Sequence, residues 1–141
     1  MTARIAVAGV SEVPIDMHAI IAAVADPAAG AVISFAGVVR DHDSGRDVAD
    51  LEYHSHPSAD RVVAEVAAEV AVKFGVIAIG VQHRVGLLTV GDVALGAAVA
   101  SAHRREAFAA CAELVEQVKH RLPVWKRQVF ADGTDEWVGS T

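Results

Sequence analysis

The feature that most constrains this chain is one stretch, residues 101–126, which reads SAHRREAFAACAELVEQVKHRLPVWK. Most of it predicts one long helix, because apolar residues recur at helical spacing and form a single stripe. The stripe consists of Phe108, Cys111, Leu114, Val115, Val118 and Leu122. Ser101 is a candidate N-cap, and Pro123 cannot continue a helix that Leu122 ends. We therefore expect a helix over residues 101–122 that packs through this stripe.

The start of this helix carries basic residues. Arg104 and Arg105 fall in its first turn, directly after His103, where the helix dipole favours acidic residues instead. Free backbone N–H groups and guanidinium groups together form a site for an anion such as phosphate. We therefore expect a small anionic group to bind at this end.

The end of the helix is also basic. Lys119 lies at the edge of the apolar stripe, so we expect it to be partly buried, with a lowered pKa that suits a nucleophile or an acid/base group. A structural explanation is equally open, because basic residues are favourable at any helix C-terminus. Lys126 follows Pro123 and stands next to Trp125.

The distribution of charge indicates the kind of ligand. Six of the twelve Lys and Arg residues lie between positions 101 and 127, although the net charge of the chain is −6. A basic segment in an acidic chain favours a small anionic ligand. The net negative charge argues against binding to nucleic acid or to an anionic membrane. The sequence has no transmembrane-length apolar run and no signal-peptide pattern, so we expect a soluble cytoplasmic protein.

The remaining pattern predicts one α+β domain over residues 1–141, with a mixed, mainly antiparallel sheet and packed helices. Helices are expected from Pro14 to Asp26 and over residues 57–74. Strands are expected over residues 4–7, 31–39, 48–54, 76–85, 93–100, 128–130 and 136–138. The polar segment 40–47 is expected to close a hairpin, and Gly37 to mark a bulge or a close approach by other backbone.

Other groups of residues give weaker evidence for a functional site. Cys111, the single cysteine, lies in the apolar stripe and is expected to be a buried structural thiol. His54 and His56 lack an evident third metal ligand, and the glycines follow neither Rossmann nor Walker spacing, so we expect no metal and no resident cofactor. The group at 41–43 (Asp, His, Asp) fits acid/base chemistry and a hairpin turn equally well.

Four segments give the chain a resemblance to a known family. They are FAGVVRDHDSG at 35–45, HRVGLLTVGD at 83–92, SAHR at 101–104 and VKHRLPVWKR at 118–127. Through them the chain resembles the large, catalytic subunit of molybdopterin synthase over nearly its whole length. The resemblance implies an α/β hammerhead fold and an enzyme that adds two sulfurs to cyclic pyranopterin monophosphate, forming the dithiolene of molybdopterin.

The resemblance also implies partners. The sulfur donor is a small ubiquitin-like subunit whose C-terminal Gly-Gly carries a thiocarboxylate and enters a pocket of the large subunit. Two large subunits form a central homodimer with one small subunit at each end, a heterotetramer.

Carried over by motif, the catalytic residues are Lys119 and Lys126, which face the thiocarboxylate and the substrate. The substrate-binding residues implied are Val38, Val39, Arg40, His103, Arg104, Lys119, Lys126, Arg127 and Gln128. Many relatives have lysine where this chain has Val38, which implies either one cation fewer or a backbone contact. Asp43 stands where relatives often have asparagine, and the chain stops at Thr141 without the basic tail of some relatives.

Two further expectations concern how the site is built. Arg104 and Lys119 are roughly 22 Å apart along one helix, so we expect each pocket to combine the two helix ends from different subunits of a dimer. The alternatives to an enzyme are a non-catalytic module that senses a phosphorylated metabolite and a subunit that only docks a ubiquitin-like partner. Lys126 favours the enzyme over the sensor, while Arg40 and His103 are unexplained by docking alone.

Overall fold

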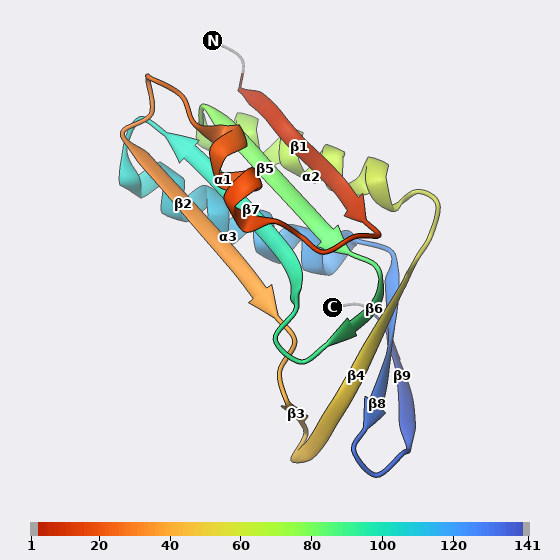
Figure 1. The fold of residues 1–141 in the computed structure, drawn as a ribbon. Coiled ribbons are helices and arrows are strands. Elements are labelled where there is room, and N and C mark those ends of the chain that lie inside the picture. Colours follow the sequence, from red (N-terminus) through yellow and green to blue (C-terminus); the bar gives the residue numbers. More distant parts are fainter. Residues whose placement is uncertain (1–2, 140–141) are drawn as a thin grey trace.

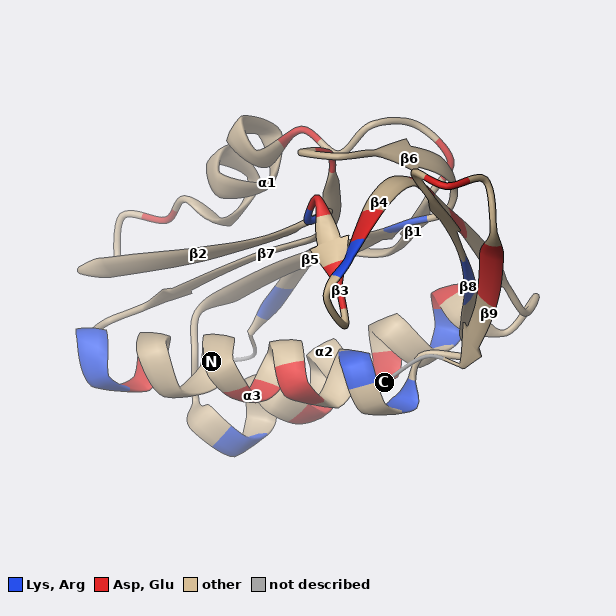
Figure 2. Cartoon of the chain, turned by 90° about the horizontal axis from the view of Figure 1, so that it is seen from below, with Lys and Arg blue, Asp and Glu red and all other residues tan. Residues whose placement is uncertain are grey.

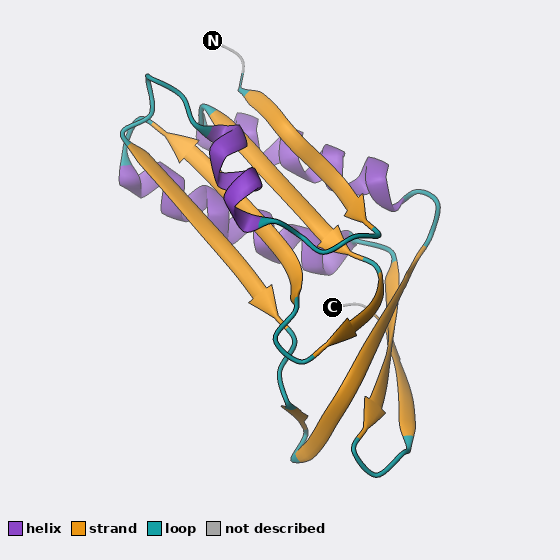
Figure 3. Ribbon diagram, in the orientation of Figure 1, coloured by secondary structure: helices purple, strands orange, loops and turns teal. Residues whose placement is uncertain are grey.

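The computed structural model describes residues 3–139 and shows an α+β architecture (Figures 1 and 3). The helices in this part of the chain are α1 (Met17–Val24), α2 (Ala59–Phe74) and α3 (Arg104–Arg121). The strands are β1 (Arg4–Ser11), β2 (Ala31–Val38), β3 (His42–Asp43), β4 (Arg46–Ser55), β5 (Ala78–Arg84), β6 (Gly86–Thr89), β7 (Val93–Ser101), β8 (Val124–Phe130) and β9 (Asp135–Gly139). The predicted fold class is confirmed.

A four-stranded sheet in the order β1-β5-β7-β2 forms the middle layer of the molecule. The long helices α2 and α3 cover one face of this sheet, and the short helix α1 covers the other (Figure 2). Strands β1 and β5 run parallel, whereas β7 is antiparallel to both of its neighbours. The sheet is therefore mixed and mainly antiparallel, as the sequence predicts. The register shifts between Gly37 and Val38, but the extra residue there is Ala94 of β7, so the bulge expected in β2 lies on the neighbouring strand.

A second, antiparallel sheet lies at one end of the first (Figure 1). Its strands follow the order β3-β4-β8-β9, and β6 pairs with β4 as well. Strand β6 was not predicted, and β8 begins at Val124 rather than at residue 128. Lys126 consequently lies within a strand, directly opposite Tyr53 of β4.

The larger apolar core fills the space between the first sheet and the helices α2 and α3. The predicted stripe of α3 contributes to this core through five residues: Cys111, Leu114, Val115, Val118 and Leu122. The sixth, Phe108, is 58 % exposed, so its predicted burial is wrong. Phe108 faces an open apolar groove beside β2 rather than the sheet, because β2 is the last strand on that side.

All three helices begin later than the sequence predicts, α2 by two residues, at Ala59. Ser101 is not the N-cap of α3, because it is the buried last residue of β7 and its backbone belongs to the β ladder. His103 takes the N-cap position without a side-chain hydrogen bond. Helix α1 begins at Met17 rather than at Pro14, because the Asp16 side chain caps it there. Among residues 3–139, no helix combines the length and apolar character needed to cross a lipid bilayer.

The expected hairpin closes through a two-residue turn between β3 and β4. Ser44 and Gly45 have φ angles of 52° and 77°, the left-handed region that a tight hairpin turn of this type requires. Glycine adopts this region without steric cost, which explains why the turn falls at this Ser-Gly pair. The hairpin brings Asp43 back toward β8.

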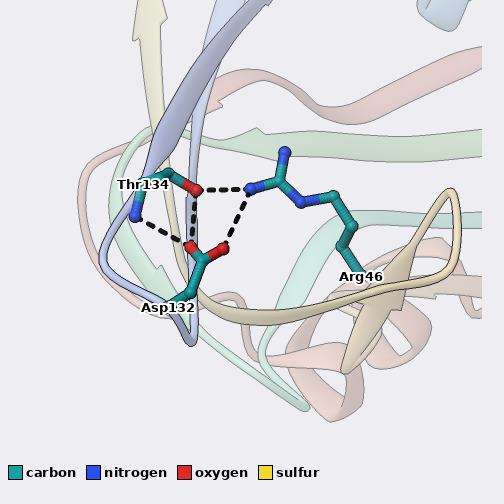
Figure 4. A network of polar contacts seen from close by, with 3 residues as sticks. All are labelled: Arg46, Asp132 and Thr134. Atoms are coloured by element: carbon teal, nitrogen blue, oxygen red, sulfur yellow. Dashed lines mark hydrogen bonds and ion pairs between the residues drawn. The ribbon is translucent and has the colours of Figure 1, made fainter.

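Arg46 connects the tip of this hairpin to the tip of the β8–β9 hairpin. Its guanidinium lies 3.6 Å above the ring centroid of Phe130. The same group pairs with Asp132 at 3.5 Å and donates a hydrogen bond to the Thr134 hydroxyl (Figure 4). Cation–π and charge-assisted contacts therefore converge on one side chain and join two segments far apart in the sequence.

Candidate active site

A cavity of about 250 Å³ opens where the two sheets meet the C-terminal end of α3. Its walls come from the end of β2 and the loop after it, from β3, from the start of β7, from one face of the paired strands β4 and β8, and from α3. Three basic side chains reach this cavity: Arg40, Lys119 and Lys126. The structure therefore brings together three of the cations that the family motifs single out.

Lys119 lies in the last turn of α3 and is partly buried, as predicted. Burial, and secondarily the nearby charge of Lys126, lower the pKa of Lys119. Arg104 lies in the first turn of α3, at the other end of the helix from Lys119. The C-terminal end of a helix dipole favours a cation, so the fold can hold Lys119 in this setting.

Strand β8 presents Lys126 and Gln128 to the cavity on one face, because alternate residues of a strand point the same way. The antiparallel register places Lys126 opposite Tyr53 and Gln128 opposite Leu51 of β4. Both β4 residues also line the cavity. Lys126 thus stands on a partly apolar floor, where its ammonium has few competing partners.

A carboxylate organises the cavity mouth. Asp43 accepts a hydrogen bond from Gln128 Nε2 at 2.9 Å and lies 3.5 Å from the Arg40 guanidinium. Gln128 is 3 % exposed, so its amide is a fixed anchor for the β3–β4 hairpin. Arg40 itself is largely exposed, in a position to meet an anion that approaches from solvent.

The two valines before Arg40 occupy different settings. Val38 is 53 % exposed at the cavity edge and supplies no charge there. Val39 is buried, and both of its backbone groups are engaged: its N–H donates to Asp92 and its carbonyl accepts from Gly91, each at 2.9 Å. Within one chain Val39 therefore shapes the wall of the cavity and offers no unoccupied backbone N–H.

The structure does not place the other predicted site residues on this cavity. His103 and Arg104 line a separate shallow hollow with Arg105 and Phe108, at the far end of α3. Figure 2 shows basic residues at both ends of α3, with acidic residues between them. Arg127 points to the opposite face of β8 from Lys126, where it pairs with Asp135 at 2.7 Å and with Glu52 at 3.8 Å.

Two groups beside the cavity were missed by the sequence reasoning. Tyr53 is buried and lines the cavity floor, and His83 of β5 packs edge-on against its ring. The alternation of Leu51 and Tyr53 in a strand was the only signal for the tyrosine. His83 lies in one of the family-like motifs, but no residue pattern indicated its burial.

The remaining candidate groups have structural partners. Cys111 is buried, and burial raises the pKa of its thiol, as expected of a structural cysteine. His54 contacts Glu52, and His56 shares a hydrogen bond with Ser58. In the part of the chain that the structure describes, no three metal-ligating side chains gather at one point.

Two lysines and an arginine around a small, partly apolar cavity form a site for an anionic ligand. Cations fixed in a partly desolvated setting can neutralise charge on a bound anion and on the transition state of its reaction. The fold and the site together define an α+β protein that binds an anion, or brings two anions together, between a helix end and a sheet.

Comparison with known proteins identifies the family. The family model described as MoaE protein matches residues 10–121. The molybdopterin synthase catalytic subunit of Nostoc is 36 % identical over 127 residues, covering 89 % of this chain and 77 % of that one. The crystal structure of molybdopterin synthase from Staphylococcus aureus superposes with a TM-score of 0.87 at 30 % identity, covering 94 % of this chain and 96 % of that one.

A more distant structure has the same fold. It is a complex of subunits 1 and 2 of the molybdopterin-converting factor from Helicobacter pylori, with a TM-score of 0.71 at 19 % identity, covering 93 % of this chain and 88 % of that one. The chain belongs to the MoaE family, the catalytic subunits of molybdopterin synthase. The resemblance drawn from the motifs is thereby confirmed, as are the assignment as an enzyme and the role in molybdopterin biosynthesis.

Proposed function

We propose that this chain transfers sulfur from the thiocarboxylated C-terminus of a small ubiquitin-like subunit to cyclic pyranopterin monophosphate, and that the reaction takes place in the cavity of Lys119 and Lys126. The observation that carries the proposal is the convergence of these two lysines, from α3 and β8, on one cavity. A thiocarboxylate and a phosphodiester are both anions, so bringing them together requires fixed cations.

The chemistry assigns a task to each group. The thiocarboxylate sulfur forms a bond with a substrate carbon as the bond between that carbon and an oxygen of the cyclic phosphate breaks. This step opens the phosphate ring and leaves the carrier tail attached to the new sulfur as an acyl group. Water then cleaves the acyl–sulfur bond, so the tail departs as a carboxylate and the sulfur stays on the pterin. Lys119 and Lys126 neutralise the tail, and Arg40 meets the phosphate, whose ring opening requires stabilisation of the leaving oxygen. A second carrier supplies the second sulfur at the neighbouring carbon, whose oxygen leaves as water.

The proposed partner agrees with the two-subunit complex formed by a structural relative. The Helicobacter pylori structure is a complex of two subunits of the molybdopterin-converting factor, in which a chain of this fold is joined by a second one. The cavity opens to solvent beside the exposed Arg40, so the end of an extended chain can enter it. We assign that entry to the C-terminal tail of the small subunit.

A homodimer would complete the site. Strand β2 is an edge strand with three large exposed apolar residues: Val32, Phe35 and Val38. Such an edge is a template for pairing with a second chain. The open groove that Phe35 forms with Phe108 extends this apolar surface onto α3.

The geometry of β2 also suits a shared pocket. Ala31, at one end of β2, pairs with Ser101 close to His103, whereas Val38, at the other end, lies at the cavity. A two-fold axis through the middle of β2, with the two copies antiparallel, would exchange these ends. His103 and Arg104 of one copy would then lie beside the Lys119 cavity of the other. A dimer of this kind with a small subunit at each end is the proposed heterotetramer.

The tail of the small subunit provides the test. The purified chain is mixed with cyclic pyranopterin monophosphate and thiocarboxylated small subunit, and dithiolene product is measured. The matched control is a small subunit that lacks its terminal Gly-Gly. We expect product only with the intact tail, even where the truncated subunit still associates. Equal product with the truncated subunit would contradict the proposal.

A further inference from the structure

Tyr53 occupies an unusual position in the cavity. The residue is 7 % exposed and lines the cavity floor. Its hydroxyl makes no hydrogen bond to any group of residues 3–139. The hydroxyl nevertheless remains accessible to solvent, because within that range Arg84 Nε is the side-chain polar atom that is both inaccessible and without a partner. A buried phenol normally finds a hydrogen-bond partner. The hydroxyl of Tyr53 thus has its donor capacity available toward the cavity.

The ring of Tyr53 is held firmly. His83 packs against it edge to face, with 4.8 Å between ring centroids and an interplanar angle of 83°. His83 is 1 % exposed and donates from Nδ1 to the carbonyl oxygen of Arg84 at 2.8 Å. The main chain of Tyr53 is fixed as well, because β4 pairs with β6 on one side and with β8 on the other. The direction of the phenol is therefore set by the fold.

The protonation states suit a donor. Burial raises the pKa of Tyr53, so its hydroxyl keeps the proton at neutral pH. Burial, assisted by the charge of Lys119, lowers the pKa of His83 to about 4, although its bond to the Arg84 carbonyl opposes the shift. His83 is consequently neutral and adds no charge, and the positive charge of the cavity comes from Arg40, Lys119 and Lys126.

We propose that Tyr53 is a ligand-binding residue of this site, whose hydroxyl donates a hydrogen bond to the anionic oxygen or sulfur that Lys119 and Lys126 neutralise. The inference rests on the proposed function and deepens it, because it adds a directional contact to two ammonium groups. An ammonium on a flexible stem attracts an anion from many directions, whereas a phenol on a fixed ring favours one. The register supports this role, since Tyr53 and Lys126 are directly opposite each other.

The ligand chemistry is a carboxylate-type or phosphate-type anion. A carboxylate or thiocarboxylate would come from the tail of the small subunit, and a phosphate from the pterin substrate. Both accept a charge-assisted hydrogen bond from a phenol, so binding experiments with separate probes must distinguish them.

The first test is Tyr53→Phe, which keeps the ring and removes the hydroxyl. We expect kcat/KM for dithiolene formation to fall about 10- to 100-fold, the effect of losing one hydrogen bond to a charged group, with an unchanged melting temperature. Ser58→Ala, which removes a hydroxyl outside the cavity, should leave kcat/KM as it was. Unchanged kcat/KM in Tyr53→Phe would overturn the inference.

The second test uses the fact that the chain has a single tyrosine. Labelling tyrosine with 13C at Cζ gives one signal, which reports hydrogen bonding of this hydroxyl. The probes are a peptide that ends in Gly-Gly with a free carboxylate, and inorganic phosphate. Movement of the signal with the peptide assigns Tyr53 to the tail, and movement only with phosphate assigns it to the substrate; either supports the donor role. No movement with either probe, although calorimetry shows at least one of them to be bound, would overturn it.

The failure of this inference is separable from failure of the proposed function. If Lys119→Ala and Lys126→Ala lose activity while Tyr53→Phe keeps it, the cavity is the site and Tyr53 is only part of its floor. If all three variants keep full activity, the reaction lies elsewhere and both proposals fall.

Discussion

His83 links the stability of the folded chain to pH. It is 1 % exposed, and its pKa is lowered from 6.5 to about 4, first by burial and then by the charge of Lys119. The folded state therefore takes up the proton at a lower pH than the unfolded state does. The stability that the neutral imidazole contributes is present above the unfolded pKa of 6.5 and is lost as pH falls from there through about 4.

We expect His83→Asn to reduce this pH dependence, because asparagine can donate to the Arg84 carbonyl but does not titrate. Between pH 7 and pH 4, the free energy of unfolding should fall by about 3 kcal/mol more in the wild-type protein than in the variant. Urea denaturation at several pH values measures the difference. His18→Asn, at an exposed histidine of α1, is the matched control and should follow the wild type. Parallel curves for His83→Asn and the wild type would contradict the account.

At the scale of elements, the β3–β4 hairpin matters because it carries Asp43 to the cavity, while Arg46 anchors the hairpin tip. We expect Arg46→Ala to lower the free energy of unfolding by about 1 kcal/mol, since it removes both the stacking on Phe130 and the contact with Asp132. Arg46→Lys should recover only part of this, because lysine lacks the planar group.

The control for this prediction is Arg61→Ala, which removes an exposed arginine whose ion pair with Glu65 lies within α2. Denaturation curves give the stability, and hydrogen exchange shows where protection is lost. The loss should concentrate in β3, β4 and the β8–β9 turn. Equal stability of the Arg46→Ala and Arg61→Ala proteins would contradict the claim that Arg46 stabilises the fold by joining the two hairpins.

The elements also show what the sequence could predict. Periodicity located α2 and most of α3, because the residues of a helix's apolar face recur three or four positions apart in the sequence. Strand β6 and the start of β8 were missed because their identity depends on pairing with β4, which is remote in the sequence. Ser101 was misassigned for the same reason: its pairing with Ala31 of β2 outweighs a local capping pattern.

For the site, local chemistry and family motifs indicated Lys119, Lys126, Arg40 and Gln128, which the structure gathers around one cavity. Tyr53 and His83 could not be predicted, because a single tyrosine or histidine in an apolar strand has many structural explanations. Their importance arises from the cross-strand pairing of Tyr53 with Lys126 and from the ring contact of Tyr53 with His83, which only the folded chain defines.

At the scale of the whole molecule, the two basic ends of α3 belong to different surfaces of one chain. The proposed two-fold axis along β2 makes a quantitative prediction. A His103→Ala, Arg104→Ala protein is mixed with a Lys119→Ala protein under conditions that exchange subunits. Activity should return to about a quarter of the wild-type level, since half of the dimers are mixed and each has one intact pocket of two.

The matched control mixes Lys119→Ala with Lys126→Ala. These residues belong to the same half of the pocket, so every pocket in a mixed dimer keeps one defect and no activity should return. Differently tagged subunits verify that exchange has occurred. With exchange verified, absence of recovery in the first mixture would mean that each site is built within one chain.

The most direct test of the central claim, that sulfur transfer takes place at the lysine cavity, is the rate of dithiolene formation by Lys119→Ala. The comparison is Lys73→Ala, which removes an exposed lysine of α2 that pairs with Glu113. With thiocarboxylated small subunit and cyclic pyranopterin monophosphate, we expect Lys119→Ala to be slower by on the order of 100-fold or more, with an intact fold by circular dichroism. Lys73→Ala should match the wild type. A Lys119→Ala protein that turns over at the wild-type rate would contradict the claim.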